Sequence, residues 1–281
     1  MSYQPAILQA IPAHASYLTW TIRSGANRIS VQQSLHALLA LTDGDRIVTG
    51  IGAALAKALD LSVSGLQEFT GIAGSQVSIP ATPAALWIWL RAEERGELVH
   101  QQLRIAEVLT PAFELQHQTG AFRYAEGRDL SGYEDGTENP QDDEALAVAV
   151  TEAGGSFVAV QQWQHDFAAL AAMAQPAKDH AIGRRLSDNE ELEDAPESAH
   201  VKRTAQEDFE PPAFMLRRSM PWSEGMHGGL YFVAFARSYQ AFEAQLRRMS
   251  GAEDGVTDAL FRFSQPQTTA YFWCPPLGWT V

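Results

Sequence analysis

The sequence is poor in cysteine, in basic residues and in long apolar runs, and each shortage excludes a class of protein. One cysteine, Cys274, among 281 residues permits no internal disulfide and no cluster of thiolate ligands, so zinc-finger and iron–sulfur sites are excluded. Lys and Arg number 20 against 34 Asp and Glu, and a net charge of -14 argues against nucleic-acid binding. No run approaches the roughly eighteen apolar residues that a membrane helix requires.

Targeting and linker signals are also missing. The first residues, 1–5, contain no basic segment followed by an apolar one, so no secretory signal is visible and we expect a cytoplasmic protein. No Gly/Ser-rich or Pro-rich linker separates independent units. The length suits two modest domains, or one domain built from two similar halves.

An alternation of strand-like and helical patterns runs through both halves of the chain. In the first half, residues 16–22, 46–51 and 112–124 predict strands, and 31–41 and 84–108 predict helices. In the second half, 156–163, 214–217, 230–235 and 268–273 predict strands, and 165–173 and 239–249 predict helices. The acidic segment 187–197 predicts an exposed loop.

These two strand–helix–strand series have similar lengths. They predict an α+β fold of two ferredoxin-like halves, each an antiparallel sheet with peripheral helices on one face. We expect the halves to cover residues 1–145 and 146–281.

An acidic turn at residues 132–140, Gly-Tyr-Glu-Asp-Gly-Thr-Glu-Asn-Pro, lies almost at the midpoint of the chain. Gly132 and Gly136 permit backbone angles that place Asp135 on a tight turn. The segment is also rich in oxygen donors, so a cation-binding loop or a plain turn is an alternative, although the spacing does not follow the EF-hand pattern.

Histidine is the expected ligand for any transition metal or haem, because the chain has one cysteine. Seven of the eight histidines have no accompanying cluster and are expected to be structural: His14, His36, His100, His117, His165, His180 and His227. His200 follows the acidic segment and precedes a basic strand that contains Arg217. Without these neighbours His200 would also be interpreted as structural, but the motifs around it favour a role as a metal or haem ligand.

Together these segments resemble the dye-decolorizing peroxidases, haem enzymes built from two ferredoxin-like halves of the dimeric α/β-barrel type. The turn at 132–140 is similar to the family's distal Gly-x-x-Asp-Gly motif, with the Thr-Glu-Asn-Pro continuation typical of class B members. Further similarity lies, in the family's order, at 154–158, 182–184, 198–200, 217–221 and 229–232.

The resemblance implies one haem b per chain, bound in the C-terminal half with His200 as its proximal ligand and metal-binding residue. It implies Asp135 and Arg217 as catalytic residues on the distal face. Ser219 is implied as a third catalytic residue, because class B members carry Asn or Ser two positions after the arginine. Of the two distal groups, we expect Arg217 to matter more for the rate, because it is charged at every working pH.

Three further residues are implied at the cofactor. Asp258 resembles the carboxylate that receives the other ring proton of His200, although Arg262 stands where the family usually has another acid. Gly136 and Arg184 are also implied as cofactor-binding residues.

The implied activity is reduction of hydrogen peroxide at ferric iron, with oxidation of dyes, phenols or other small aromatic one-electron donors. A haem-binding protein that stores haem, transfers it or releases its iron without peroxidase turnover is the alternative. We expect a homo-oligomer with neither nucleic-acid nor membrane partners, because sheet edges invite pairing and symmetric dimers are common. The chain stops at Val281 after the last expected strand, so we expect no tail for encapsulation.

Overall fold

A computed structural model describes residues 2–281. The strands are β1 His14–Ile22, β2 Ile47–Ile51, β3 Leu86–Ala92, β4 Phe113–Phe122, β5 Ser156–His165, β6 Leu216–Arg217, β7 Met220–Glu224, β8 His227–Ala236, β9 Ser264–Pro266 and β10 Ala270–Cys274. The α-helices are α1 Arg28–Leu41, α2 Ala53–Ala58, α3 Arg95–Leu109, α4 Asp142–Ala149, α5 Phe167–Ala172, α6 Gln175–Ile182, α7 His200–Arg203 and α8 Gln240–Met249. Short 3-10 helices lie at Pro5–Ile7, Gln206–Asp208 and Ala259–Arg262.

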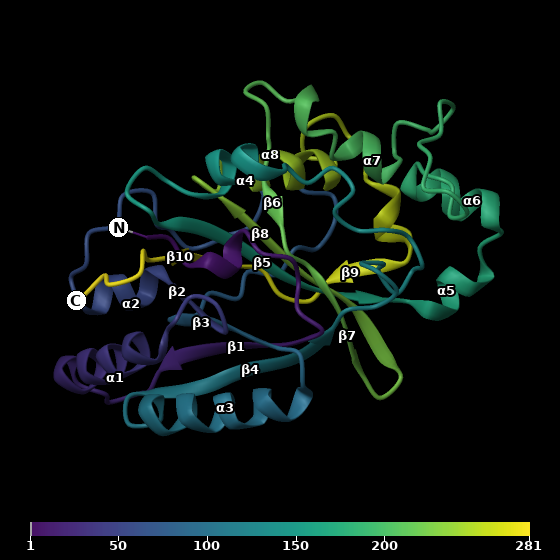
Figure 1. The fold of residues 1–281 in the computed structure, drawn as a ribbon. Coiled ribbons are helices and arrows are strands. Elements are labelled where there is room, and N and C mark those ends of the chain that lie inside the picture. The colour runs from purple at the N-terminus through teal and green to yellow at the C-terminus, as the bar shows by residue number, and fades with distance from the viewer. Residues whose placement is uncertain (1) are drawn as a thin grey trace.

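The strands close into an antiparallel barrel. Its ring runs β8-β7-β4-β1-β3-β2-β10-β5 and returns to β8, while β6 extends the ring beside β8 and β9 extends it beside β5. Two joints are narrow: Ala121 pairs with Trp222 between β4 and β7, and Trp273 pairs with Ile51 between β10 and β2. Helices α1 and α3 lie on one side of the barrel, and α4, α7 and α8 lie on the opposite side (Figure 1).

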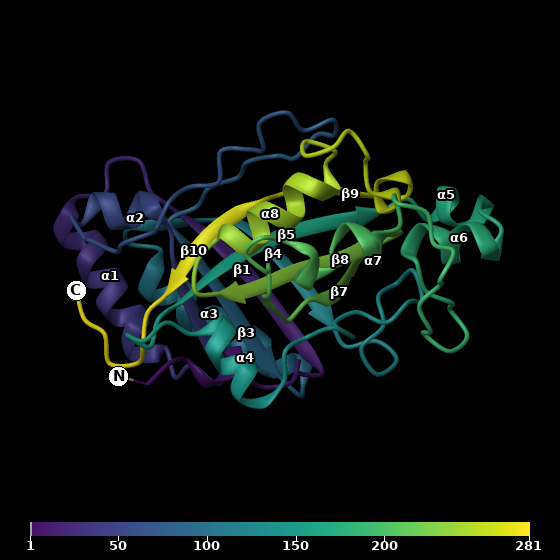
Figure 2. The same cartoon turned by 90° about the horizontal axis from the view of Figure 1, so that it is seen from above.

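Large aromatic side chains fill the barrel interior, because alternate residues of each strand point inward. Tyr17 and Tyr231, from strands of different halves, stack with ring centroids 3.8 Å apart, and the Trp87 indole donates a hydrogen bond to the Tyr231 hydroxyl. Outside the barrel, α8 covers β5, β8 and β10 through Phe242 and Leu246. Helices α5 and α6 project at one end, and the two chain ends lie together at the other (Figure 2).

The predicted helix over 84–108 is wrong in its first part. Residues 86–92 form β3, and α3 begins only at Arg95. Every residue of β3 is buried, because β1 and β2 pair with its two edges and the core covers both faces. Apart from Arg91, this strand is apolar at every position instead of alternating, and Leu86 and Leu90 fall at helical spacing without forming a helix.

The other predicted strands and helices are present, several with shifted ends, and β7, β9, α2, α4, α6 and α7 are additional. The acidic segment 187–197 is confirmed as a mostly exposed loop, with one isolated bridge between Arg184 and Glu191 at its start. Over residues 2–281, no helix combines the length and the apolar character needed to cross a membrane.

Candidate active site

A cavity opens between the outer face of β5 and β8, helices α7 and α8, and the segment that leads into the acidic turn. Its empty space, including open solvent at the mouth, is about 850 Å³. Its apolar walls are Trp163, Ile182, Met215, Leu230, Phe232, Phe242, Leu246, Met249 and Leu260. Its polar walls are Asp129, Ser131, Tyr133, Glu134, Asp135, Gln161, His165, His200, Thr204, Arg217, Gln245 and Ser264.

His200 enters this cavity from the first position of α7. Its Nδ1 lies 2.8 Å from Oδ2 of Asp258, a side chain with no solvent exposure. A bond to this carboxylate places a proton on Nδ1, which in a neutral imidazole leaves the lone pair of Nε2 for a ligand. The other oxygen of Asp258 accepts the backbone N–H of Leu260 at 2.8 Å, so the carboxylate is fixed on both sides.

Arg217 reaches the cavity from the end of β6. Its Nε is buried without a hydrogen-bond partner, and its guanidinium forms no ion pair with any residue in 2–281. A partly buried cation in that state favours an anionic or hydrogen-bond-accepting ligand.

The acidic turn is tied to β6 by the side chain of Asn139. Its Oδ1 accepts the backbone N–H of Arg217 at 2.8 Å, and its Nδ2 donates to the carbonyl of Arg217 at 3.1 Å. The backbone N–H of Arg218 donates to the carbonyl of Val233 in β8. Because successive residues of a strand bond to opposite sides, the N–H and C=O of Arg217 point away from β8. Asn139 therefore couples the turn that carries Asp135 to the strand that carries Arg217.

Gly136 is required by this arrangement. Its φ is 79°, and a Cβ at this position would lie 2.7 Å from Nδ2 of Asn139. Gly136 itself is not among the cavity walls, whereas its neighbour Asp135 is.

The sequence did not indicate that His165 lies at the cavity. His165 is buried, as a structural histidine should be, yet it also lines the cavity. Its Nε2 lies 2.9 Å from Oδ1 of Asp129, and its Nδ1 lies 2.8 Å from the hydroxyl of Ser264. Burial has the largest single effect on Asp129 and raises its pKa, but the hydrogen bond and charge of His165 together with hydrogen bonds from Ser131 outweigh burial and leave the pKa of Asp129 below its ordinary value.

Ser219 and Arg184, like Gly136 and Asp258, are implied as functional but lie outside the cavity walls. The buried hydroxyl of Ser219 accepts the N–H of Val233 at 3.4 Å. Arg184 binds the carboxylates of Glu138 at 2.7 Å and Glu191 at 3.2 Å, and so links the acidic turn to the following loop. Nor do three His, Cys, Asp or Glu side chains of residues 2–281 converge as metal ligands, so the cation-binding alternative for the turn gains no support.

Comparison with known proteins gives a consistent result. A family model described as "Dyp-type peroxidase, C-terminal" matches residues 126–278. A dye-decolorizing peroxidase of Mycolicibacterium paratuberculosis is 30% identical, over 97% of this chain and 83% of the relative. The structure of the encapsulated DyP-type peroxidase from Mycobacterium smegmatis is similar with a TM-score of 0.86 and 27% identity, over 98% and 96% of the two chains. A Rhodococcus jostii DypB variant in complex with heme gives a TM-score of 0.84 and 27% identity, over 96% and 95%.

Proposed function

Because the chain belongs to the dye-decolorizing peroxidase family, we propose that its cavity binds haem through His200 and uses it to reduce hydrogen peroxide. The observation that carries the proposal is one cavity lined by His200, Asp135 and Arg217, with the buried Asp258 bonded to His200. Small aromatic molecules serve as the electron donors. The relative is named a peroxidase, which favours turnover over the alternative of haem storage or iron release.

The residues of the cavity fit a haem. Nine apolar side chains could cover a planar macrocycle, and the bond at Nδ1 fixes the His200 ring so that Nε2 could bind the iron. The bond to Asp258 increases the basicity of the imidazole, which stabilises oxidised iron. One haem b per chain would therefore be held from the C-terminal half.

Haem, when bound, would supply the redox-active iron that peroxide reduction requires. Asp135 can take a proton from one peroxide oxygen and return it to the other, directly or through water. Arg217 can donate hydrogen bonds to the oxygen that gains negative charge as the O–O bond breaks. Asn139 holds these two groups in a fixed relation, because it bonds to the backbone of Arg217 from the turn that carries Asp135.

We also propose that the barrel consists of two ferredoxin-like halves that meet near residue 145. The strand order β4-β1-β3-β2 in the first half and β10-β5-β8-β7 in the second supports this division, because each is the same antiparallel pattern. Helix α4, at 142–149, then lies across the boundary.

The net charge of -14 favours neutral or cationic donors over anionic dyes. A homo-oligomer remains our proposal for the assembly. Encapsulation is stated for the Mycobacterium smegmatis relative alone, and the expected lack of an encapsulation tail stays a prediction for this chain.

The test is a stopped-flow absorption experiment in which the ferric haem protein is mixed with one equivalent of peroxide. We expect a rapid change of the haem spectrum, slowed about 10²–10³-fold in Arg217→Leu, as when an oxyanion donor is removed. Arg247→Leu is the matched control. This substitution changes charge and size in the same way, but at an exposed position of α8. A wild-type haem spectrum that does not respond to peroxide would favour storage instead.

A further inference from the structure

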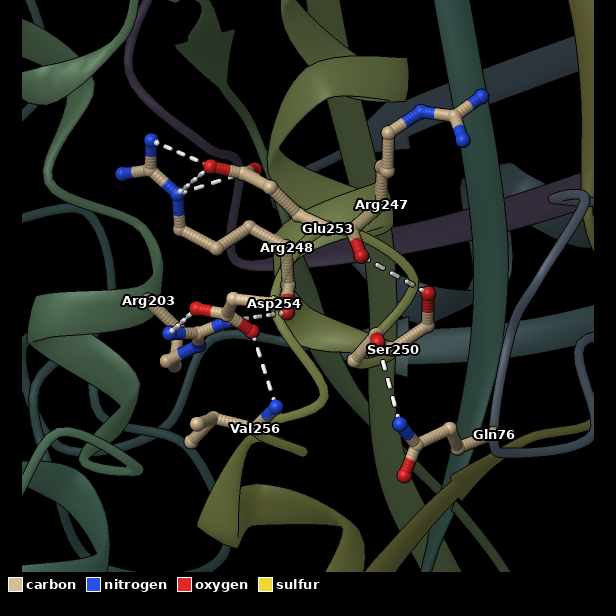
Figure 3. Close-up of polar contacts among 9 residues, drawn as sticks. Gln76, Arg203, Arg247, Arg248, Ser250, Glu253, Asp254 and Val256 are labelled. Atoms are coloured by element: carbon tan, nitrogen blue, oxygen red, sulfur yellow. Dashed lines mark hydrogen bonds and ion pairs between the residues drawn. The ribbon is translucent and has the colours of Figure 1, made fainter.

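An ion pair links the helix that carries His200 to the loop that carries Asp258. Arg203 ends α7, three residues after His200, and Asp254 lies four residues before Asp258. The guanidinium of Arg203 binds both carboxylate oxygens of Asp254, each at 2.7 Å, and it also binds the carbonyl of Arg248 at 2.7 Å (Figure 3). Such a bidentate pair fixes orientation as well as distance.

Arg203 is 5% exposed, whereas the side chain of Asp254 is 41% exposed. Asp254 and Arg203 are each other's sole ion-pair partner within residues 2–281. A guanidinium buried with one carboxylate is held firmly in place, because any other position would leave its charge unpaired.

Hydrogen bonds within the loop after α8 fix Asp258 relative to Asp254. Oδ1 of Asp254 accepts the N–H of Val256 at 2.9 Å, a contact also drawn in Figure 3, and the N–H of Asp258 bonds to the carbonyl of Met249 at 2.8 Å. An isolated bridge between Ser250 and Thr257 closes the loop further.

The two segments run side by side with three successive contacts. Ala259 donates its N–H to the carbonyl of Ser198 at 2.7 Å, His200 bonds to Asp258, and Arg203 bonds to Asp254. Helix α7 has four residues and lacks a side-chain N-cap, so its orientation depends on tertiary contacts.

We propose that Arg203 is a positioning residue, whose ion pair with Asp254 sets α7 at the distance at which Nδ1 of His200 bonds to Asp258. The functional consequence rests on the proposed haem ligation by His200. The geometry itself belongs to the chain and is open to measurement without haem.

The decisive variant is Asp254→Asn, with Glu253→Gln as its matched control. Glu253 is also 41% exposed and also pairs with an arginine, Arg248, but it does not contact α7. Each substitution removes one negative charge from the same loop, so long-range electrostatic effects are equal. Asn at 254 keeps an oxygen for the N–H of Val256, which preserves the loop.

Two readouts separate positioning from general stability. In the haem-free protein, the Nδ1 proton of His200 should give a slowly exchanging NMR signal in the wild type and in Glu253→Gln, and a faster-exchanging one in Asp254→Asn. In the haem-loaded protein, Asp254→Asn should raise the ferric/ferrous potential, in the same direction as Asp258→Asn, and speed haem loss roughly tenfold. Arg203→Lys keeps the charge without the bidentate geometry, so its values for proton exchange, potential and haem loss should lie between those of the wild type and Asp254→Asn.

The inference is overturned if Asp254→Asn matches Glu253→Gln in the exchange of the His200 proton. If the proton responds as expected while His200→Ala leaves the haem spectrum unchanged, the positioning holds and the proposed ligation by His200 fails.

Discussion

Replacing Asn139 by Ala tests whether the acidic turn and β6 form one unit. The substitution removes both bonds between the Asn139 side chain and the backbone of Arg217, at 2.8 and 3.1 Å. The carbonyl of Arg217 keeps the guanidinium of Arg218 as a partner at 3.0 Å, so only the N–H is left unsatisfied. A lost hydrogen bond contributes about 1 kcal/mol, and an unsatisfied, partly buried N–H adds about 1 kcal/mol or more.

We therefore expect the free energy of unfolding of Asn139→Ala to fall by about 2 kcal/mol. For a chain of this size the Tm should fall by roughly 3–4 °C. Since both distal groups lose their common support, kcat/KM for peroxide should fall about 10- to 100-fold while haem binding persists. Gln141→Ala is the control, because Gln141 donates to the carbonyl of Asn139 at 2.9 Å without reaching β6.

Thermal unfolding of the haem-free protein and steady-state peroxide kinetics measure the two effects. Unchanged Tm and unchanged kcat/KM in Asn139→Ala would refute the coupling. Gly136→Ala gives a further test. The left-handed backbone at residue 136 makes alanine cost about 1–2 kcal/mol whether or not Asn139 is present. The clash of the new Cβ with the Asn139 side chain adds to this cost only when Asn139 is present. Equal costs of Gly136→Ala with and without Asn139 would also contradict the structure.

Other predictions concern the two faces of the cavity and its anchors. His200→Ala should fold but lose the haem absorption band on titration with haem, and retention of the wild-type band would argue against it as the ligand. Peroxide turnover should fall more in Arg217→Leu than in Asp135→Asn, and the opposite order in steady-state kinetics would sink the assignment of the larger role to Arg217. The depressed pKa of Asp129 contributes stability that is present above its unfolded value, about 3.9, and is lost as pH falls through the folded value. In His165→Leu the hydrogen bond from Ser131 remains but those from His165 are lost, so the pKa of Asp129 should rise and the part of the acid-induced loss of Tm that Asp129 causes should become smaller; identical Tm–pH curves for the two proteins would count against this.

The distal and proximal residues could be predicted because they stand in short contiguous motifs. Asp135, His200 and Arg217 come to one cavity, and the predicted bond between His200 and Asp258 is present. Their catalytic and ligand roles stay predictions. Most helices and strands were also predictable, because their apolar periodicity follows from having one buried face.

The supporting contacts could not be predicted. Asp129 and His165 are 36 residues apart, Arg203 and Asp254 are 51 apart, and Asn139 and Arg217 are 78 apart. No local pattern encodes contacts at such separations, since each depends on how the strands pair. The same reason explains the error at β3: only its place between β1 and β2 makes every position buried.

The pairing of β2 with β10 can form only late in synthesis, because the two strands lie near opposite ends of the chain. Residue 51 pairs with residue 273, and the side chain of Gln4 bonds to the carbonyls of both Thr49 and Pro275. At a synthesis rate of about 5–20 residues per second, β2 waits on the order of ten seconds or more for its neighbour. During that interval its edge is an open template for pairing with another nascent chain. We therefore expect the chain to be prone to pairing with other chains while it is still attached to the ribosome.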